Sequence, residues 1–301
     1  MINLDELTGL CEKLGCRIIP ECPLSEYVTF RFGGCCRALI SINSAQSAAD
    51  LISYMNDKSI RYDIIGRGSN IIVDDNGFDG VILLFGSDFA AIEISENIIR
   101  CEAGALLASA CVHAQQSGLS GMENLFGIPG TVGGALFMNA GAYGTEMKDI
   151  VISAEYIDED GKLRTVSREE MALSYRHSIF SDSSCAILSV TIQLENGDPD
   201  EIKKAMNECM AKRSSKQPLE YPSAGSTFKR PEGSYASLLI EQCGLKGMQC
   251  GGAMVSEKHS GFVINLGYAT CNDVLELCSE IQKIVKEKTG YILELEPVIL
   301  K

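Results

Sequence analysis

Two glycine-rich segments are the parts of this 301-residue chain that most clearly suggest chemistry. The first consists of Gly66, Arg67, Gly68, Ser69 and Asn70 and follows an apolar run. Glycines let a backbone approach a ligand closely and turn its N–H groups toward an anion. Ser69 and Asn70 add side-chain donors. A plain hairpin turn explains the same pattern equally well, so this segment alone decides nothing.

The second segment, GIPGTVGGALFMNAGAYG, covers residues 127–144 and holds six glycines. Loops of this length are usually polar, whereas this one is apolar as well as rich in glycine. Gly133 and Gly134 precede ALFMN, so the loop is expected to lead into a helix whose first turn would favour phosphate. These features suit a large, flat cofactor that carries a pyrophosphate. The alternative is tight packing between elements.

The standard short motifs of other enzyme classes are absent from the sequence. It contains no GxGxxG, GxxxxGK[ST], HExxH or GxSxG, which disfavours a Rossmann dinucleotide site and several hydrolase mechanisms. The three histidines, His113, His177 and His259, lie far apart in the chain. A histidine triad or a histidine-rich metal site is therefore not expected, and we predict no metal.

Composition narrows the class of protein further. The formal net charge is −14, which opposes binding to nucleic acid or to anionic lipid, so we expect neither partner. The chain lacks a signal peptide and any apolar run of membrane-spanning length. Its 13 cysteines fit a disulfide framework, a zinc site or reduced core thiols, and the irregular spacing favours the thiols. A reducing, cytoplasmic location follows from this interpretation.

Hydrophobic periodicity predicts the elements that must position these segments. Helices are expected at 3–15, 45–57, 105–117, 198–213 and 272–287, the fourth with Met210 on its apolar face. Strands are expected on both sides of the first glycine turn, within 81–101, at 151–157, 162–166 and 185–194, and as a closing pair at 291–295 and 297–300. The mixture indicates an α+β fold. NGDPD at 196–200 predicts a boundary between domains 1–197 and 198–301.

Further segments agree with one known family along nearly the whole chain and in the same order. They are TFRFGG at 29–34, SYRHS at 174–178, SAGSTFKRP at 223–231, SLLIEQCGLKG at 237–247 and LEP at 295–297. Together with the two glycine-rich segments, they resemble the UDP-N-acetylenolpyruvoylglucosamine reductases of bacterial cell-wall precursor synthesis. The spacing of about 50 residues between Arg176 and Ser226 resembles the shorter subclass, which lacks a tyrosine-bearing lid loop, so how the UDP part is held stays open.

The resemblance implies a fold, a cofactor and a reaction. The fold would be a vanillyl-alcohol-oxidase-type FAD-binding fold in two α+β subdomains, followed by a C-terminal α+β substrate-binding domain. The enzyme would bind FAD non-covalently and take hydride from NADPH. It would reduce the enolpyruvyl ether of UDP-N-acetylglucosamine to UDP-N-acetylmuramate, with no obligatory protein partner. The residues expected to bind FAD are Gly66, Arg67, Gly68, Ser69, Asn70, Gly127, Ile128, Pro129, Gly130, Thr131, Val132, Gly133, Gly134, Ala140 and Gly141.

Three residues match the catalytic positions of the resembling family. Reduction of the enol ether sends charge into the substrate carboxylate, and Arg176 could hold that carboxylate with two parallel hydrogen bonds. Glu296, as an acid, could donate a further hydrogen bond, which requires a raised pKa. Ser226 matches the proton donor and would need activation by its surroundings. Taken singly, each residue is more often a surface charge or a turn cap.

Weaker candidates for contacts with the substrate or NADPH phosphates are Tyr175, Arg213, Lys216, Lys229, Lys258 and His259. Arg213 and Lys216 follow a predicted helix, where cations also complement the helix dipole, and both interpretations stay open. Two rival functions remain: another FAD-dependent oxidase or dehydrogenase of the same superfamily, and a non-catalytic nucleotide-sugar binder. Release of the flavin by acid would argue against the first, and NADPH oxidation would exclude the second.

Overall fold

A computed structural model of the protein describes residues 2–301, which form two compact units. The first unit comprises residues 2–20, 37–67 and 80–212, and the second comprises 21–36, 68–79 and 213–301. Two early segments therefore fold with the C-terminal part of the chain. The boundary at 197/198 concerns functional domains and stays a prediction.

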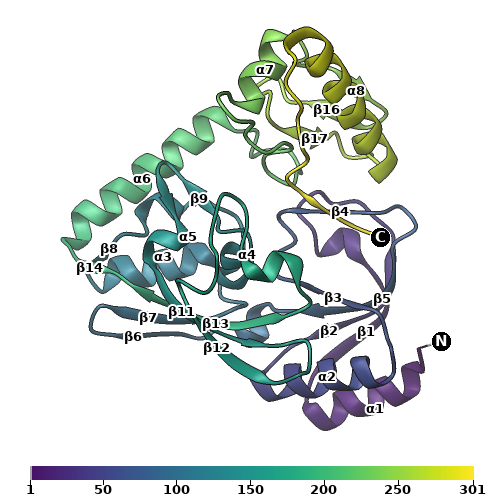
Figure 1. Cartoon of the computed structure of the whole chain (residues 1–301), viewed down its shortest axis with the longest axis vertical. Coiled ribbons are helices and arrows are strands. Elements are labelled where there is room, and N and C mark those ends of the chain that lie inside the picture. Colours follow the sequence, from purple (N-terminus) through teal and green to yellow (C-terminus); the bar gives the residue numbers. More distant parts are fainter. Residues whose placement is uncertain (1) are drawn as a thin grey trace. The chain divides into compact units, whose positions relative to one another are not determined.

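A sheet of four strands in the order β1-β2-β5-β3 lies mostly in the first unit. Their bounds are Arg17–Pro23, Cys35–Ser41, Phe78–Leu84 and Tyr62–Ile65, and β3 runs parallel to β5. Helices α1 (Leu4–Leu14) and α2 (Ala45–Asp57) lie along this sheet in Figure 1 and bury Leu7, Cys11 and Leu51 in a common core with it. Side-chain caps from Asn3 and Ser44 start the two helices, which confirms their predicted positions.

A second, fully antiparallel sheet in this unit has the order β12-β11-β13-β7-β6. Its strands are Leu163–Ser167, Val151–Ile157, Ala186–Gln193, Ile98–Glu102 and Ile92–Ser95. Helix α4 (Val132–Phe137) packs on β13, β7 and helix α3 (Leu107–Gln116). The second glycine-rich segment therefore rests on the sheet, and its predicted helix is confirmed.

Short elements complete the first unit. They are β8 (Leu119–Ser120), β9 (Gly141–Ala142), β10 (Thr145–Glu146), β14 (Glu195–Asn196), α5 (Met147–Ile150) and the 3-10 turns η2 (Ser87–Phe89), η3 (Glu123–Leu125) and η4 (Ile179–Asp182). The remaining 3-10 turn, η1 (Leu24–Glu26), belongs to the second unit. Helix α6 (Pro199–Lys216) follows and buries Ile202, Met206 and Cys209. The expectation for Met210 was wrong, because its side chain is 40% exposed.

The second unit combines the sheet β15-β16-β17 with helices α7 (Ala236–Gln242) and α8 (Cys271–Thr289). The strands are Gln249–Cys250, Ala253–Val255 and Val263–Asn265. Helix α8 starts at a Thr270 capping box, ends at Gly290 in the left-handed conformation, and buries the apolar face that its periodicity predicted. Thus both ends of this helix are encoded locally.

The expected closing strand pair was wrong. Residues 291–295 form no regular strand and make one isolated bridge, between Leu295 and Phe228. The final strand β18 (Val298–Leu300) instead pairs in parallel with β4 (Ile71–Val73), as Figure 1 shows for the yellow C-terminal strand. A parallel partner more than 200 residues away leaves no turn signal in the sequence.

Other expectations concern cysteines and the membrane. The cysteines are free thiols, most of them buried, in agreement with their interpretation as small core residues. Burial raises the pKa of Cys101 and Cys278 to about 12. Across residues 2–301, the structure contains no helix with the length and apolar character needed to cross a bilayer.

Candidate functional site

The first glycine turn is held in place mainly by its own backbone and by Asn70. Gly68 has φ +62°, and an added Cβ would overlap the carbonyl of Tyr27. The backbone N–H of Thr29 donates to the Gly68 carbonyl at 3.2 Å. The Asn70 amide donates to the Glu296 carbonyl at 3.2 Å, and the Asn70 carbonyl accepts the Val298 N–H at 2.9 Å. Asn70 therefore fixes the chain segment that carries Glu296 and leads into β18.

The two glycine-rich segments meet at Gly66 and Thr131. A Cβ on Gly66 would overlap the Thr131 hydroxyl, so only glycine permits this approach. Thr131 also caps α4, because its hydroxyl accepts the Gly134 N–H at 3.3 Å. The structure thus brings together two segments that lie about 60 residues apart in the chain.

The glycines of the second segment have different surroundings. A Cβ on Gly133 would lie 2.7 Å from the Ala103 Cβ, so Gly133 serves close packing. A Cβ on Gly134 would meet only the Thr131 hydroxyl, at 3.4 Å, and Gly134 is exposed. The packing interpretation therefore holds for Gly133, whereas the face at Gly134 is open.

A cavity of about 560 Å³ in the first unit adjoins this meeting point. Its lining includes the predicted residues Gly66, Arg67 and Thr131. The sequence did not reveal the rest of its lining, which consists of Gly86, Ser87, Ala90, Ile92, Gly104, Leu106, Ser109 and His113. One signal in the sequence could have revealed part of this lining: Gly104 lies shortly before a helix whose first turn carries Ser109.

The chemistry of this lining fits FAD. Ile92, Leu106 and Ala90 provide apolar wall for a flat ring, while Arg67 supplies a cation and Ser109 a hydroxyl. A Cβ on Gly104 would overlap the carbonyl of Gly86, so this glycine permits two backbone segments to form one wall. The described residues 2–301 contain no cluster of three or more His, Cys, Asp or Glu side chains arranged to hold a metal.

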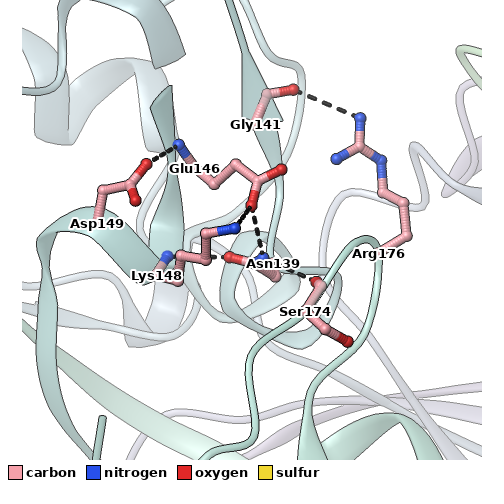
Figure 2. Close-up of polar contacts among 7 residues, drawn as sticks. All are labelled: Asn139, Gly141, Glu146, Lys148, Asp149, Ser174 and Arg176. Carbon is pink, nitrogen blue, oxygen red and sulfur yellow. Dashed lines mark hydrogen bonds and ion pairs between the residues drawn. The ribbon is translucent and has the colours of Figure 1, made fainter. Parts of the chain in front are cut away.

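Arg176 lies in the first unit, in a tight turn of residues 174–177. Ser174 and His177 exchange backbone hydrogen bonds of 3.1 and 3.2 Å, and Arg176 has φ +56°. Its guanidinium donates to the Gly141 carbonyl at 3.4 Å and lies over the Tyr175 ring, 4.9 Å from the centroid (Figure 2 shows the first contact). The turn therefore presents both predicted residues, Tyr175 and Arg176, at one place.

Ser226 and Glu296 both lie in the second unit, on neighbouring backbone segments. The Glu296 N–H donates to the Thr227 carbonyl at 3.0 Å, and Phe228 forms the bridge with Leu295. Thr227 is buried, and its hydroxyl accepts the Val263 N–H at 2.8 Å, whereas Ser226 is exposed. The structure thus brings together two of the three predicted catalytic residues and anchors them through Thr227.

Part of the predicted cationic set also gathers in the second unit. Burial holds the pKa of His259 below its ordinary value, and the charges of Lys246 and Lys216 act in the same direction. Lys258 precedes His259 in the chain and forms an ion pair of 3.5 Å with Glu220. Lys229 instead pairs with Glu294 at 3.7 Å, and Arg213 lies in the last turn of α6.

Comparisons with known proteins decide the family. The model of the C-terminal domain of UDP-N-acetylenolpyruvoylglucosamine reductase matches residues 217–300, and that of an FAD binding domain matches residues 36–167. The UDP-N-acetylenolpyruvoylglucosamine reductase of Caldanaerobacter subterraneus subsp. tengcongensis is 47% identical over 277 residues, which are 92% of this chain and 91% of that protein. The chain belongs to the UDP-N-acetylenolpyruvoylglucosamine reductase family.

Other members of the reductase family agree with this assignment. The reductase of Clostridium perfringens is 43% identical over 283 residues, covering 94% of this chain and 93% of that protein. The crystal structure of the Thermus caldophilus reductase superposes with a TM-score of 0.81 at 32% identity, covering 95% of this chain and 99% of that one. The expected α+β fold, with an FAD-binding part and a C-terminal domain, is confirmed, and the protein is an FAD-containing oxidoreductase.

Proposed function

We propose that this reductase takes hydride from NADPH and reduces the enolpyruvyl ether of UDP-N-acetylglucosamine to UDP-N-acetylmuramate, a precursor of peptidoglycan. The observation that carries the proposal is the 47% identity with a reductase of that name over 92% of the chain. The retained Arg176, Ser226 and Glu296 support it. The net charge and the lack of a membrane-crossing helix in residues 2–301 are compatible with a cytoplasmic enzyme that needs no nucleic acid, membrane or protein partner.

The cavity beside Gly66 and Thr131 is the proposed site for part of the cofactor, held without a covalent bond. Arg67 would face the negative pyrophosphate, and the apolar side chains Ile92 and Leu106 would pack on a ring. The backbone of residues 127–130, the start of α4 and residues Ala140 and Gly141 would complete the site. Bound FAD supplies hydride transfer between NADPH and the substrate.

Arg176, Glu296 and Ser226 have separate proposed roles. Arg176 would bind the substrate carboxylate, where charge accumulates during reduction, and Glu296 would donate a hydrogen bond to the same group. Ser226 would deliver a proton to the carbon that carries the ether oxygen. The anchoring of Thr227 to both Glu296 and Val263 supports the last two roles, because it fixes the backbone on either side of the site.

The cations Lys216, Lys258 and His259 are the proposed contacts for the substrate phosphates. An acidic protein repels a nucleotide sugar unless local cations attract it. Lys258 and His259 are adjacent in the chain and lie in the same unit as Lys216, which supports a common site, whereas Lys229 and Arg213 remain weaker proposals. Residues 198–301 would then form the substrate-binding domain and residues 1–197 the FAD-binding region.

A coupled assay tests this function against its rival within the superfamily. Purified protein should consume NADPH only when the UDP-enolpyruvyl sugar is present, and mass spectrometry should find the product two hydrogens heavier. Acid denaturation should release all of the flavin. A flavin that stays attached, together with oxygen-dependent turnover of an alcohol, would instead identify an oxidase.

A further inference from the structure

The turn of residues 174–177 holds Arg176 in an unfavourable backbone conformation. At φ +56°, this backbone conformation costs a residue other than glycine or asparagine roughly 1–2 kcal/mol, because its Cβ crowds the following carbonyl. Such a conformation persists only where neighbouring groups hold it. The contacts that hold this turn therefore also fix where the Arg176 guanidinium lies.

One side chain outside the turn contacts it through a fully used amide. Asn139 is completely buried, and its amide nitrogen donates to the Ser174 carbonyl at 2.8 Å and to the Glu146 carboxylate at 3.1 Å. Its amide oxygen accepts the Lys148 N–H at 2.9 Å. Both donors and the acceptor of the amide are thus engaged, as Figure 2 shows.

These three bonds join the turn to the β9–β10 hairpin and to α5, which follows the hairpin directly. Gly141, which opens that hairpin, accepts from the Arg176 guanidinium, and Glu146 closes it. The carboxylate of Glu146 also pairs with the Lys148 ammonium at 2.6 Å. Although burial opposes the shift, the pKa of Glu146 is lowered by Lys148 first, then by the Asn139 hydrogen bond and the Arg176 charge. The same hairpin therefore contacts both the turn that carries Arg176 and the guanidinium end of its side chain.

We propose that Asn139 is a positioning residue for the reductase reaction, which holds the turn so that Arg176 points at the substrate carboxylate. The proposal rests on the proposed role of Arg176. Asn139 itself needs no contact with substrate. Neither Ser174 nor Gly141 can be replaced to the same effect, because both contribute backbone carbonyls, so Asn139 is the side chain through which the geometry can be changed.

The test compares both half-reactions in Asn139→Ala and in the wild type by stopped-flow absorbance under anaerobic conditions. The rate of reduction by NADPH should stay within about threefold of the wild-type rate. Reoxidation by the UDP-enolpyruvyl sugar should slow by roughly 10- to 100-fold, because misplacing a catalytic group by about 1 Å typically costs up to about 100-fold in rate. Asn124→Ala is the matched control, because the Asn124 amide donates to the same hairpin at Thr145, 3.1 Å away, and not to the turn. It should behave like the wild type.

A double-mutant cycle separates this inference from the proposed role of Arg176. In an Arg176→Ala background, Asn139→Ala should slow reoxidation by less than about threefold, because both changes remove the same interaction. An equal loss in both backgrounds would overturn the positioning role. If Arg176→Ala alone leaves reoxidation unchanged, the proposed role of Arg176 fails instead.

Asn139→Asp keeps the test decisive if the alanine variant does not fold. The aspartate has the same shape, but when ionised it cannot donate to the Ser174 carbonyl, whereas its protonated form can. Reoxidation and calorimetric affinity for the UDP-enolpyruvyl sugar should both recover toward wild-type values as the pH is lowered. A deficit that does not change with pH relative to the wild type would contradict the role of the donated hydrogen bond.

Discussion

Replacing Gly134 by valine should weaken FAD binding while leaving the fold intact. A Cβ at this position meets only the Thr131 hydroxyl, at an ordinary contact distance of 3.4 Å. Replacement of glycine inside a helix raises stability by up to about 1 kcal/mol, with less gain for a β-branched residue. The free energy of unfolding of the apoprotein should therefore change by less than about 1 kcal/mol. The two γ-methyl groups would occupy the open face where the cofactor is proposed to lie.

Fluorescence titration of apoprotein with FAD measures the consequence directly. We expect the dissociation constant of Gly134→Val to rise at least tenfold, which corresponds to about 1.4 kcal/mol. Gly133→Ala is the matched control, because its Cβ would lie 2.7 Å from the Ala103 Cβ. That overpacking should cost about 1–3 kcal/mol of folding stability, visible as a lower Tm of the apoprotein. Wild-type FAD affinity in Gly134→Val would refute the proposed position of the cofactor.

Two further predictions concern catalysis and pH. Arg176→Ala and Glu296→Ala should each lower kcat by roughly 10²–10³ with little change in Tm, since each removes one preorganised electrostatic partner. Steady-state kinetics and thermal unfolding check this. Unchanged turnover in either variant would exclude a catalytic role for that residue. Because burial keeps the pKa of His259 below 6.5 in the folded state, the unfolded chain binds more protons below that pH. The free energy of unfolding of the wild type should therefore fall as the pH drops through 6.5, and that of His259→Asn, measured by denaturant unfolding, should depend less on pH. Identical pH profiles of the two proteins would contradict this.

The sequence predicted elements well where the signal was local. Helices α2 and α8 have capping residues, Ser44 and Thr270, next to an apolar periodicity, and both appear where expected. The final strand was predicted correctly at 297–300, but its partner was not, because β18 pairs with β4 and such long-range parallel pairing depends on the assembled fold. The same reason explains why residues 21–36 and 68–79 were not recognised as parts of the second unit.

The candidate site shows the same division between local and assembled features. The glycine turns and the YR pair at Tyr175 and Arg176 were visible as motifs. The cavity wall formed by Ser109 and His113 was not, because these residues become neighbours of Gly66 only after α3 packs. Asn139 was overlooked for another reason: its role depends on three hydrogen bonds whose partners are mostly backbone groups, which no side-chain pattern reveals.

The central claim, that the chain reduces a UDP-enolpyruvyl sugar with Ser226 as proton donor, is tested most directly by the two half-reactions of Ser226→Ala. NADPH should bleach the flavin band at close to the wild-type rate, because that step needs no proton from Ser226. Return of the band on addition of the UDP-enolpyruvyl sugar should slow by roughly 10²–10⁴, the usual value of general-acid catalysis. Ser226→Cys should recover part of the loss, because a thiol can also deliver a proton. Equal slowing of both half-reactions, or a flavin that the UDP-enolpyruvyl sugar fails to reoxidise even in the wild type, would contradict the account.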